Sequence, residues 1–323
     1  MPAISGYGAI SSSFVSVAAG VAHGAALTRD GAVMCWGTWS ADSDSDSDSE
    51  SDSGEDADFC SQSDGVEYVA VCACNNYTAA LAADGEVRVL GPRKLPVRRP
   101  EGLPPLARID AGGHFIVGLT AEGDVVLWST DKSIRRKLWP RSGELSPFDV
   151  LTSASLDPWR TAVEVRAGFE HFAVLMRPLP GYEAYGMDVL TFGTTGVPRS
   201  IAGTYDVTMH SEPVQMRCGL SYVFCVVRAP AWRVWFDMWE APGSGAGNKG
   251  NMPTLVQCLE IPTHIPIDGE VCAGDHHLVC VNGSECFVVA DEASDLPTLT
   301  RCTLRAPLAS RKGVEARSLA RSL

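Results

Sequence analysis

The feature that most constrains the fold is a pattern that recurs six times along the chain. When a phase mark is set in each copy, apolar residues stand one and three positions before it and five and seven positions after it. The marks are Gly20, Cys74, Gly112, Gly168, Gly219 and Gly274. Apolar residues with a period of two indicate β-strands that bury one face. The copies are therefore predicted to be strand units, with marks separated by 38 residues (74 to 112) to 56 residues (112 to 168).

Each unit is also predicted to contain a hairpin. Asp30-Gly31, Asp84-Gly85 and Glu122-Gly123 stand ten and eleven positions after their marks. A glycine at such a site permits the positive φ that a tight turn between two strands requires. The strand that passes through the mark is therefore expected to be followed by two more strands, joined by this turn.

A ring-bearing side chain stands three positions after every mark. The ring positions are His23, Tyr77, Phe115, His171, Tyr222 and His277. The three histidines suggest catalysis or metal binding when each is considered alone. A general base could not be replaced by phenylalanine, so a position that accepts His, Tyr and Phe is better interpreted as structural. We expect these rings to fasten each unit by hydrogen bonds or by packing.

Strand units of this length predict a radial or stacked array, because one small sheet cannot bury its own face without a neighbour. A β-propeller is the closed form of such an array. The motif Ala-Gly-x-x-His-x-x-Ala-Leu-Thr-x-x-Gly-x-Val-x-x-Trp-Gly at residues 19–37 resembles the repeat of the regulator of chromosome condensation family. The resemblance extends over roughly residues 15–290, and it implies a seven-bladed propeller. The family's Gly-Gln-Leu-Gly segment after Trp-Gly is missing almost everywhere in this chain.

Six units can be counted, so a seventh blade is expected to be degenerate or closed by the two termini. In the second case, residues 4–10 would supply an outer strand with partners near residues 299–304. Residues 1–300 are predicted to form one all-β propeller domain, and residues 301–323 a basic, disordered tail. The chain has 11 cysteines, an odd number, and no basic-headed signal segment. We therefore expect a monomer with free thiols, located in the cytoplasm, the nucleus or both, and not attached to a membrane.

A strongly acidic stretch interrupts the first unit. Residues 41–58 hold nine carboxylates and no basic residue, and they account for most of the net charge of −13. Like charges without an apolar core predict a disordered insertion, which we assign to residues 40–64. Serines at every second position in this acidic context are candidate phosphorylation sites: Ser43, Ser45, Ser47, Ser49, Ser51 and Ser53. The alternative is a solubilising low-complexity segment without a specific partner.

The corresponding segments of the second and third units are basic. Candidate partner-binding residues are Arg93, Lys94, Arg98, Arg99, Lys132, Arg135, Arg136, Lys137 and Arg141. Because these segments leave their hairpins at the same phase as the acidic insertion, a propeller would put all three on one face. We hypothesise that the acidic insertion covers this basic rim and competes with an anionic partner, which would be an acidic protein or nucleic acid. The alternative is that they are ordinary solvated loops.

Two sets of side chains contain enough soft ligands for zinc, but their spacing argues against it. One is Cys72 with Cys74, and the other contains Cys272, His276, His277, Cys280 and Cys286. His277 is a ring position, and the rest lack paired finger spacing. The sequence also lacks a phosphate-binding glycine loop and a nucleophile elbow. We therefore predict no catalytic residue, no cofactor and no metal.

These observations favour a non-catalytic protein-interaction scaffold. The family resemblance implies three possible functions: guanine-nucleotide exchange on a small GTPase, attachment to chromatin, and scaffolding for another enzyme. The loops that exchange would need do not match here, so a guanine-nucleotide exchange factor for a Ran-like GTPase is the alternative. A metal-dependent hydrolase with its site in the propeller channel is a distant third.

Overall fold

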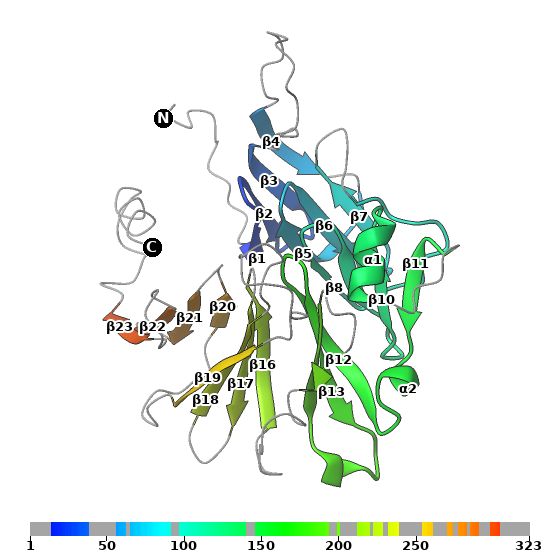
Figure 1. Cartoon of the computed structure of the whole chain (residues 1–323). Helices are drawn as coiled ribbons and strands as arrows, with labels where there is room; N and C mark the ends of the chain where they lie inside the picture. Colours follow the sequence, from blue (N-terminus) through cyan, green and yellow to red (C-terminus); the bar gives the residue numbers. More distant parts are fainter. Residues whose placement is uncertain are drawn as a thin grey trace.

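The computed structural model forms a β-propeller (Figure 1). It describes residues 14–38, 56–62, 65–91, 97–139, 146–193, 199–200, 212–219, 222–228, 232–238, 254–260, 270–273, 277–282, 285–290 and 298–303. These residues make six antiparallel sheets, five with four strands and one with three. The sheets follow one another in chain order around a common centre, and the innermost strands of successive sheets contact each other. The predicted all-β propeller is thus confirmed.

Every sheet runs from an innermost strand outward. The first sheet holds β1 (Phe14–Ala19), β2 (His23–Thr28), β3 (Val33–Thr38) and β4 (Asp56–Gln62). The second holds β5 (Tyr68–Cys74), β6 (Tyr77–Ala82) and β7 (Val87–Leu90). The third holds β8 (Arg108–Ala111), β9 (Ile116–Leu119), β10 (Val125–Trp128) and β11 (Phe148–Leu151).

The remaining three sheets repeat this order. The fourth holds β12 (Arg160–Ala167), β13 (Phe172–Pro178), β14 (Asp188–Phe192) and β15 (Arg199–Ser200). The fifth holds β16 (Glu212–Cys218), β17 (Tyr222–Arg228), β18 (Trp232–Met238) and β19 (Thr254–Glu260). The sixth holds β20 (Glu270–Ala273), β21 (His277–Asn282), β22 (Glu285–Ala290) and β23 (Thr298–Thr303). Short helices α1 (Lys132–Leu138) and α2 (Ser153–Leu156) flank β11, and the 3-10 helix η1 (Glu183–Tyr185) lies between β13 and β14.

The core lies between neighbouring sheets. The second strands β2 and β6 are buried along their whole length, because a propeller blade is covered on both faces by the blades beside it. The apolar residue three positions before the mark packs on the preceding blade. Val71 lies in one cluster with Leu27 and Val33 of the first sheet, and Ile109 lies with Leu81 of the second. The repeat thus encodes packing between blades as well as strands.

The predicted hairpins form at the expected residues. Gly31, Gly85 and Gly123 have φ of 81°, 86° and 89°, the left-handed region that a side chain disfavours. The second and third strands on either side of each glycine pair in antiparallel register. The fourth unit replaces this short turn with a longer connection over residues 179–187, which contains η1.

Three sequence expectations change in the structure. Residues 56–62 form β4, which pairs with β3, although they lie inside the predicted disordered insertion 40–64. β23 pairs with β22 as the outer strand of the sixth sheet, so residues 298–303 are already used there and are not the start of a closing blade. This strand also extends into the predicted tail 301–323. Residues 4–10 lie outside the described part of the chain, and the seventh blade stays a prediction.

Candidate functional site

The strand order gives the propeller two different faces. Innermost strands end at the phase mark, so the third strands of the same sheets end at the same side. We call this side the return-segment face, because the chain leaves the third strands there, at Thr38, Leu90 and Trp128. The hairpins between second and third strands lie on the opposite side, which we call the turn face.

The predicted basic residues do not all gather on the return-segment face. Lys132 and Arg136 of α1 follow the end of β10 and are exposed. The Arg99 guanidinium instead lies 2.8 Å from the Glu86 carboxylate, next to the turn at Gly85, so Arg99 and the neighbouring exposed Arg98 lie toward the turn face. In the described part of the chain the second sheet has three strands, and Val97 and Leu103 of the segment that follows pack into its core. Arg93, Lys94 and Arg141 lie outside the described residues, as does the side chain of Lys137.

Helix α1 is held firmly against the third blade. The Asp131 carboxylate accepts the Ser133 amide at 2.7 Å, and hydrogen bonding from Ser133 lowers the pKa of Asp131. Arg135 is buried, with its guanidinium 2.7 Å from the Ser146 carbonyl and 3.4 Å from the Asp149 carboxylate. Leu138 and the following Trp139 enter the core shared by the third and fourth blades.

Among the basic residues of α1 whose side chains are described, Lys132 and Arg136 are exposed and lie one helical turn apart. Arg135, which the sequence places among the partner-binding candidates, faces inward and stabilises the packing of the helix. The burial of Arg135 could not be predicted, because the side of a short helix that packs against the protein cannot be read from a run of consecutive basic residues.

The ring positions connect one blade to the next. The His23 Nε2 atom lies 2.9 Å from the Thr78 hydroxyl, and the Tyr77 hydroxyl lies 2.6 Å from the carbonyl oxygens of both Gly112 and Phe115. The Phe115 ring packs against Phe172 of the fourth blade, with ring centroids 6.3 Å apart.

The rings of His23, Phe115 and His171 are buried over the glycines at their phase marks, whereas the mark before Tyr77 is Cys74. A Cβ on Gly112 would lie 2.2 Å from the Phe115 ring, and one on Gly168 would lie 2.0 Å from the ring of His171. Burial lowers the pKa of His23, so its imidazole is neutral at neutral pH. Tyr222 and His277 begin β17 and β21, but their side chains lie outside the described set.

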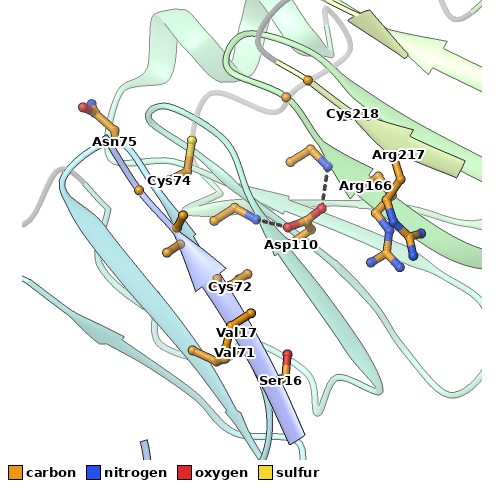
Figure 2. Close-up of a pocket in the computed structure, with 18 of the residues that line it drawn as sticks. Ser16, Val17, Val71, Cys72, Cys74, Asn75, Asp110, Arg166, Arg217 and Cys218 are labelled. Carbon is orange, nitrogen blue, oxygen red and sulfur yellow. Dashed lines mark hydrogen bonds between the residues drawn. The ribbon is translucent and has the colours of Figure 1, made fainter. Parts of the chain in front are cut away.

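The innermost strands surround an axial cavity of about 820 Å³ (Figure 2). One repeat position, two residues before the mark, contributes a lining residue from each of the first five blades. These residues are Ala18, Cys72, Asp110, Arg166 and Arg217. Sequence reasoning missed this row, because its residue type varies from blade to blade. The only available signal was its parity, which is opposite to that of the apolar core positions.

The charged side of the cavity is formed by the third, fourth and fifth blades. The two Asp110 oxygens accept the amides of Ala111 and Ala167, each at 2.9 Å (Figure 2). Burial raises the pKa of Asp110, although the Arg166 guanidinium opposes this shift. Arg166 and Arg217 both approach the Glu164 carboxylate, at 2.6 Å and 3.5 Å. The ion pairs join the fourth blade to the fifth, and Asp110 joins the third blade to the fourth through the Ala167 amide.

Two cysteines of the cavity, Cys72 and Cys218, are poor nucleophiles. The Cys72 thiol donates toward the Ala79 carbonyl at 3.7 Å, and burial raises the pKa of both Cys72 and Cys218 well above the ordinary thiol value. Within the described ranges, no group of three or more His, Cys, Asp or Glu side chains is placed to hold a metal ion. A helix of sufficient length and apolarity to cross a membrane is also not found in those ranges.

Comparisons with known proteins agree with this architecture. Residues 14–40 match the family model described as the regulator of chromosome condensation (RCC1) repeat. The yeast protein Prp20, solved with Kap60 bound, is 14% identical, with a TM-score of 0.57 over 86% of this chain and 70% of that one. This chain is a divergent propeller similar to the regulator of chromosome condensation.

Two further solved structures show the same fold. Prp20p of Saccharomyces cerevisiae, solved with a study of its binding to Gsp1p and histones, is 14% identical, with a TM-score of 0.56 over 86% of this chain and 72% of that one. Human WBSCR16 is 12% identical, with a TM-score of 0.56 over 87% of this chain and 77% of that one. No curated protein sequence matches the chain. At these identities the likeness to this type of propeller is one of fold.

Proposed function

We propose that the chain is a non-catalytic scaffold that binds a partner protein through the return-segment face. The observation that carries the proposal is that the ring positions His23 and Tyr77 make buried contacts between blades, although a histidine such as His23 suggests catalysis when it is considered alone. What differs from blade to blade is the segment that follows each third strand. Variable loops on a rigid scaffold are the usual place for recognition.

The partner that this face suits is anionic. Helix α1 holds Lys132 and Arg136 outward on a rigid base, so little ordering is lost when a partner binds. The acidic run 41–58 leaves the first blade on the same side, and it would compete for the same basic residues. Phosphorylation at Ser43 to Ser53 would add negative charge and strengthen this competition. An acidic protein is the first candidate partner, and nucleic acid is the second.

Deletion of residues 41–55, which leaves β4 intact, tests this regulation directly. We expect the shortened chain to bind a polyglutamate peptide more tightly than the full chain at low salt, and the gain to disappear in the double variant Lys132→Glu/Arg136→Glu. Arg98→Gln, an exposed arginine toward the other face, serves as the matched control and should keep the gain. Unchanged binding after the deletion would refute competition by the acidic run.

A guanine-nucleotide exchange factor for a Ran-like small GTPase is the second candidate. It is favoured by the structural likeness to Prp20p, whose structural report describes binding to Gsp1p. The two functions are separated by the release of a fluorescent guanine nucleotide from such a GTPase. A scaffold leaves the release rate unchanged, whereas acceleration by the chain would favour the exchange factor. Either function fits a protein of the cytoplasm, the nucleus or both.

A further inference from the structure

Three aromatic side chains form an exposed cluster on the turn face of the fourth blade. Trp159, Tyr182 and Tyr185 are 40%, 38% and 51% exposed. Trp159 stacks on Tyr185 with ring centroids 5.7 Å apart and planes 10° apart, and it lies 4.9 Å from the Tyr182 ring. We call this set the aromatic platform. Clustered large aromatic side chains on a surface mark an interaction site more often than single ones do.

The platform is held together by one partly buried arginine. Arg160 donates from Nε to the Gly186 carbonyl at 2.9 Å and from Nη2 to the Tyr185 carbonyl at 2.6 Å. Its third nitrogen, Nη1, pairs with the Asp157 carboxylate and lies 3.9 Å from that of Asp188. The connection that carries both tyrosines is thus tied to the first strand of its own blade.

Backbone contacts complete the attachment. The Leu179 amide donates to the Trp159 carbonyl at 2.9 Å, which joins the tryptophan to the start of the tyrosine connection. The Glu183 carboxylate accepts the Gly181 amide at 2.9 Å and closes the turn before η1. Rings held in place before binding lose little conformational entropy when a partner arrives, so their contact area converts efficiently into affinity.

The charge of the turn-face hairpins indicates which partner fits. Arg98 and Arg99 lie toward this face on the second blade, where Arg99 pairs with Glu86. The four described hairpin connections between second and third strands carry Arg29 as their only basic residue. Their acidic residues are Asp30, Asp84, Glu86, Glu122, Asp124 and Glu183. Glu183 belongs to the platform connection itself, is exposed, and has its pKa lowered by the Gly181 amide, so it is ionised at neutral pH.

The acidic turn of the third blade lies beside the platform's blade. The Ser153 hydroxyl donates to the Gly123 carbonyl at 2.5 Å, and the Ser153 amide donates to Asp124 at 3.2 Å. The basic residues of the fourth blade on this side are Arg160, which is paired with Asp157, and Arg177, which is exposed on β13. Acidic groups therefore lie on the turn face of both the platform's blade and the blade before it.

We propose that the aromatic platform is a docking surface for a basic, arginine- or lysine-rich segment of a partner protein. The flat cationic group of an arginine can stack on Trp159 and Tyr185, whose ring faces attract cations. Glu183 of the same connection supplies opposite charge, and Glu122 adds negative charge on the turn face of the preceding blade. A neutral proline-rich segment also packs on aromatic side chains, but it would gain nothing from these carboxylates. The platform lies on the face opposite to Lys132 and Arg136, so this site is separate from the function proposed above.

Fluorescence anisotropy with the full chain tests the proposal. The probes are a short labelled peptide rich in arginine and lysine, the same peptide with every basic residue replaced by glutamine, and a neutral proline-rich peptide. We expect only the basic peptide to bind. Trp159→Ala and Tyr185→Ala should each weaken it by about tenfold, as truncation of a central aromatic contact does. Glu183→Gln, which keeps an oxygen for the Gly181 amide, should weaken it by about threefold and reduce its salt dependence.

Two matched controls separate the platform from other acidic surfaces. Tyr185→Phe keeps the ring and should bind as the native chain does, and Lys132→Gln lies on the other face and should also have no effect. The run 41–58 attracts basic peptides as well, but its contribution to binding should be the same in Trp159→Ala as in the native chain. Equal binding by the native chain, Trp159→Ala and Tyr185→Ala would overturn the proposal. Stronger binding of the proline-rich or glutamine peptide would overturn it too. Only variants whose unfolding midpoint in urea equals that of the native chain are included in this comparison.

Discussion

The contact between the second and third blades offers a sharp test of how the propeller is held together. Tyr77 is fully buried, and its hydroxyl lies 2.6 Å from the Gly112 and Phe115 carbonyl oxygens. In Tyr77→Phe the ring still fills its place. The Phe115 carbonyl keeps the Gly112 amide at 2.9 Å, whereas the Gly112 carbonyl loses the hydroxyl. A buried acceptor left without its donor costs about 1–3 kcal/mol.

Urea unfolding followed by tryptophan fluorescence and circular dichroism measures this change. With a slope of about 3 kcal/mol per molar urea, a loss of 2 kcal/mol lowers the midpoint by about 0.7 M. Tyr77→Ala also removes the ring and should cost about 4 kcal/mol or more. Tyr182→Phe, at an exposed tyrosine, should change the free energy of unfolding by less than about 0.5 kcal/mol. A Tyr77→Phe variant as stable as the native chain would refute the linking role of the hydroxyl.

Further predictions concern other contacts between and within blades. Because burial lowers the pKa of His23 below its ordinary 6.5, the unfolded chain takes up a proton that the folded chain does not. The free energy of unfolding should therefore decrease as pH falls below about 6.5, and less steeply in His23→Gln. Gly112→Ala should cost about 1–3 kcal/mol in urea unfolding, because its Cβ would meet the Phe115 ring at 2.2 Å. Arg135→Met should cost about 3 kcal/mol by leaving Asp149 without its buried cation, and Asp149→Leu in the same chain should restore part of the loss.

The repeat made most of the fold predictable. A period of two in the apolar positions and a glycine at a fixed distance from the mark are local signals, so the hairpins around Gly31, Gly85 and Gly123 follow from the chain itself. The ring position was interpretable because six copies could be compared. Residues that vary between copies carry no such information, and the axial row with Asp110 and Arg166 was missed for that reason.

The surfaces were predictable only in part. The basic segments were placed by phase alone. The second sheet has three strands in the described part of the chain, and Arg99 of the segment that follows pairs with Glu86 beside the turn at Gly85. The burial of Arg135 depends on which side of α1 meets the blade, which no pattern in seven residues defines. The aromatic platform joins Trp159 to tyrosines more than twenty positions later, and only the fold of the fourth blade brings them together.

The central claim, that the chain binds a partner through the return-segment face, is tested most directly by hydrogen–deuterium exchange on the chain with and without its purified stable partner. The account predicts slower exchange on binding in the segment that carries α1 and in the segment that leaves β3, with little change in the innermost strands. Unchanged exchange over residues 129–139 in a saturated complex would contradict it.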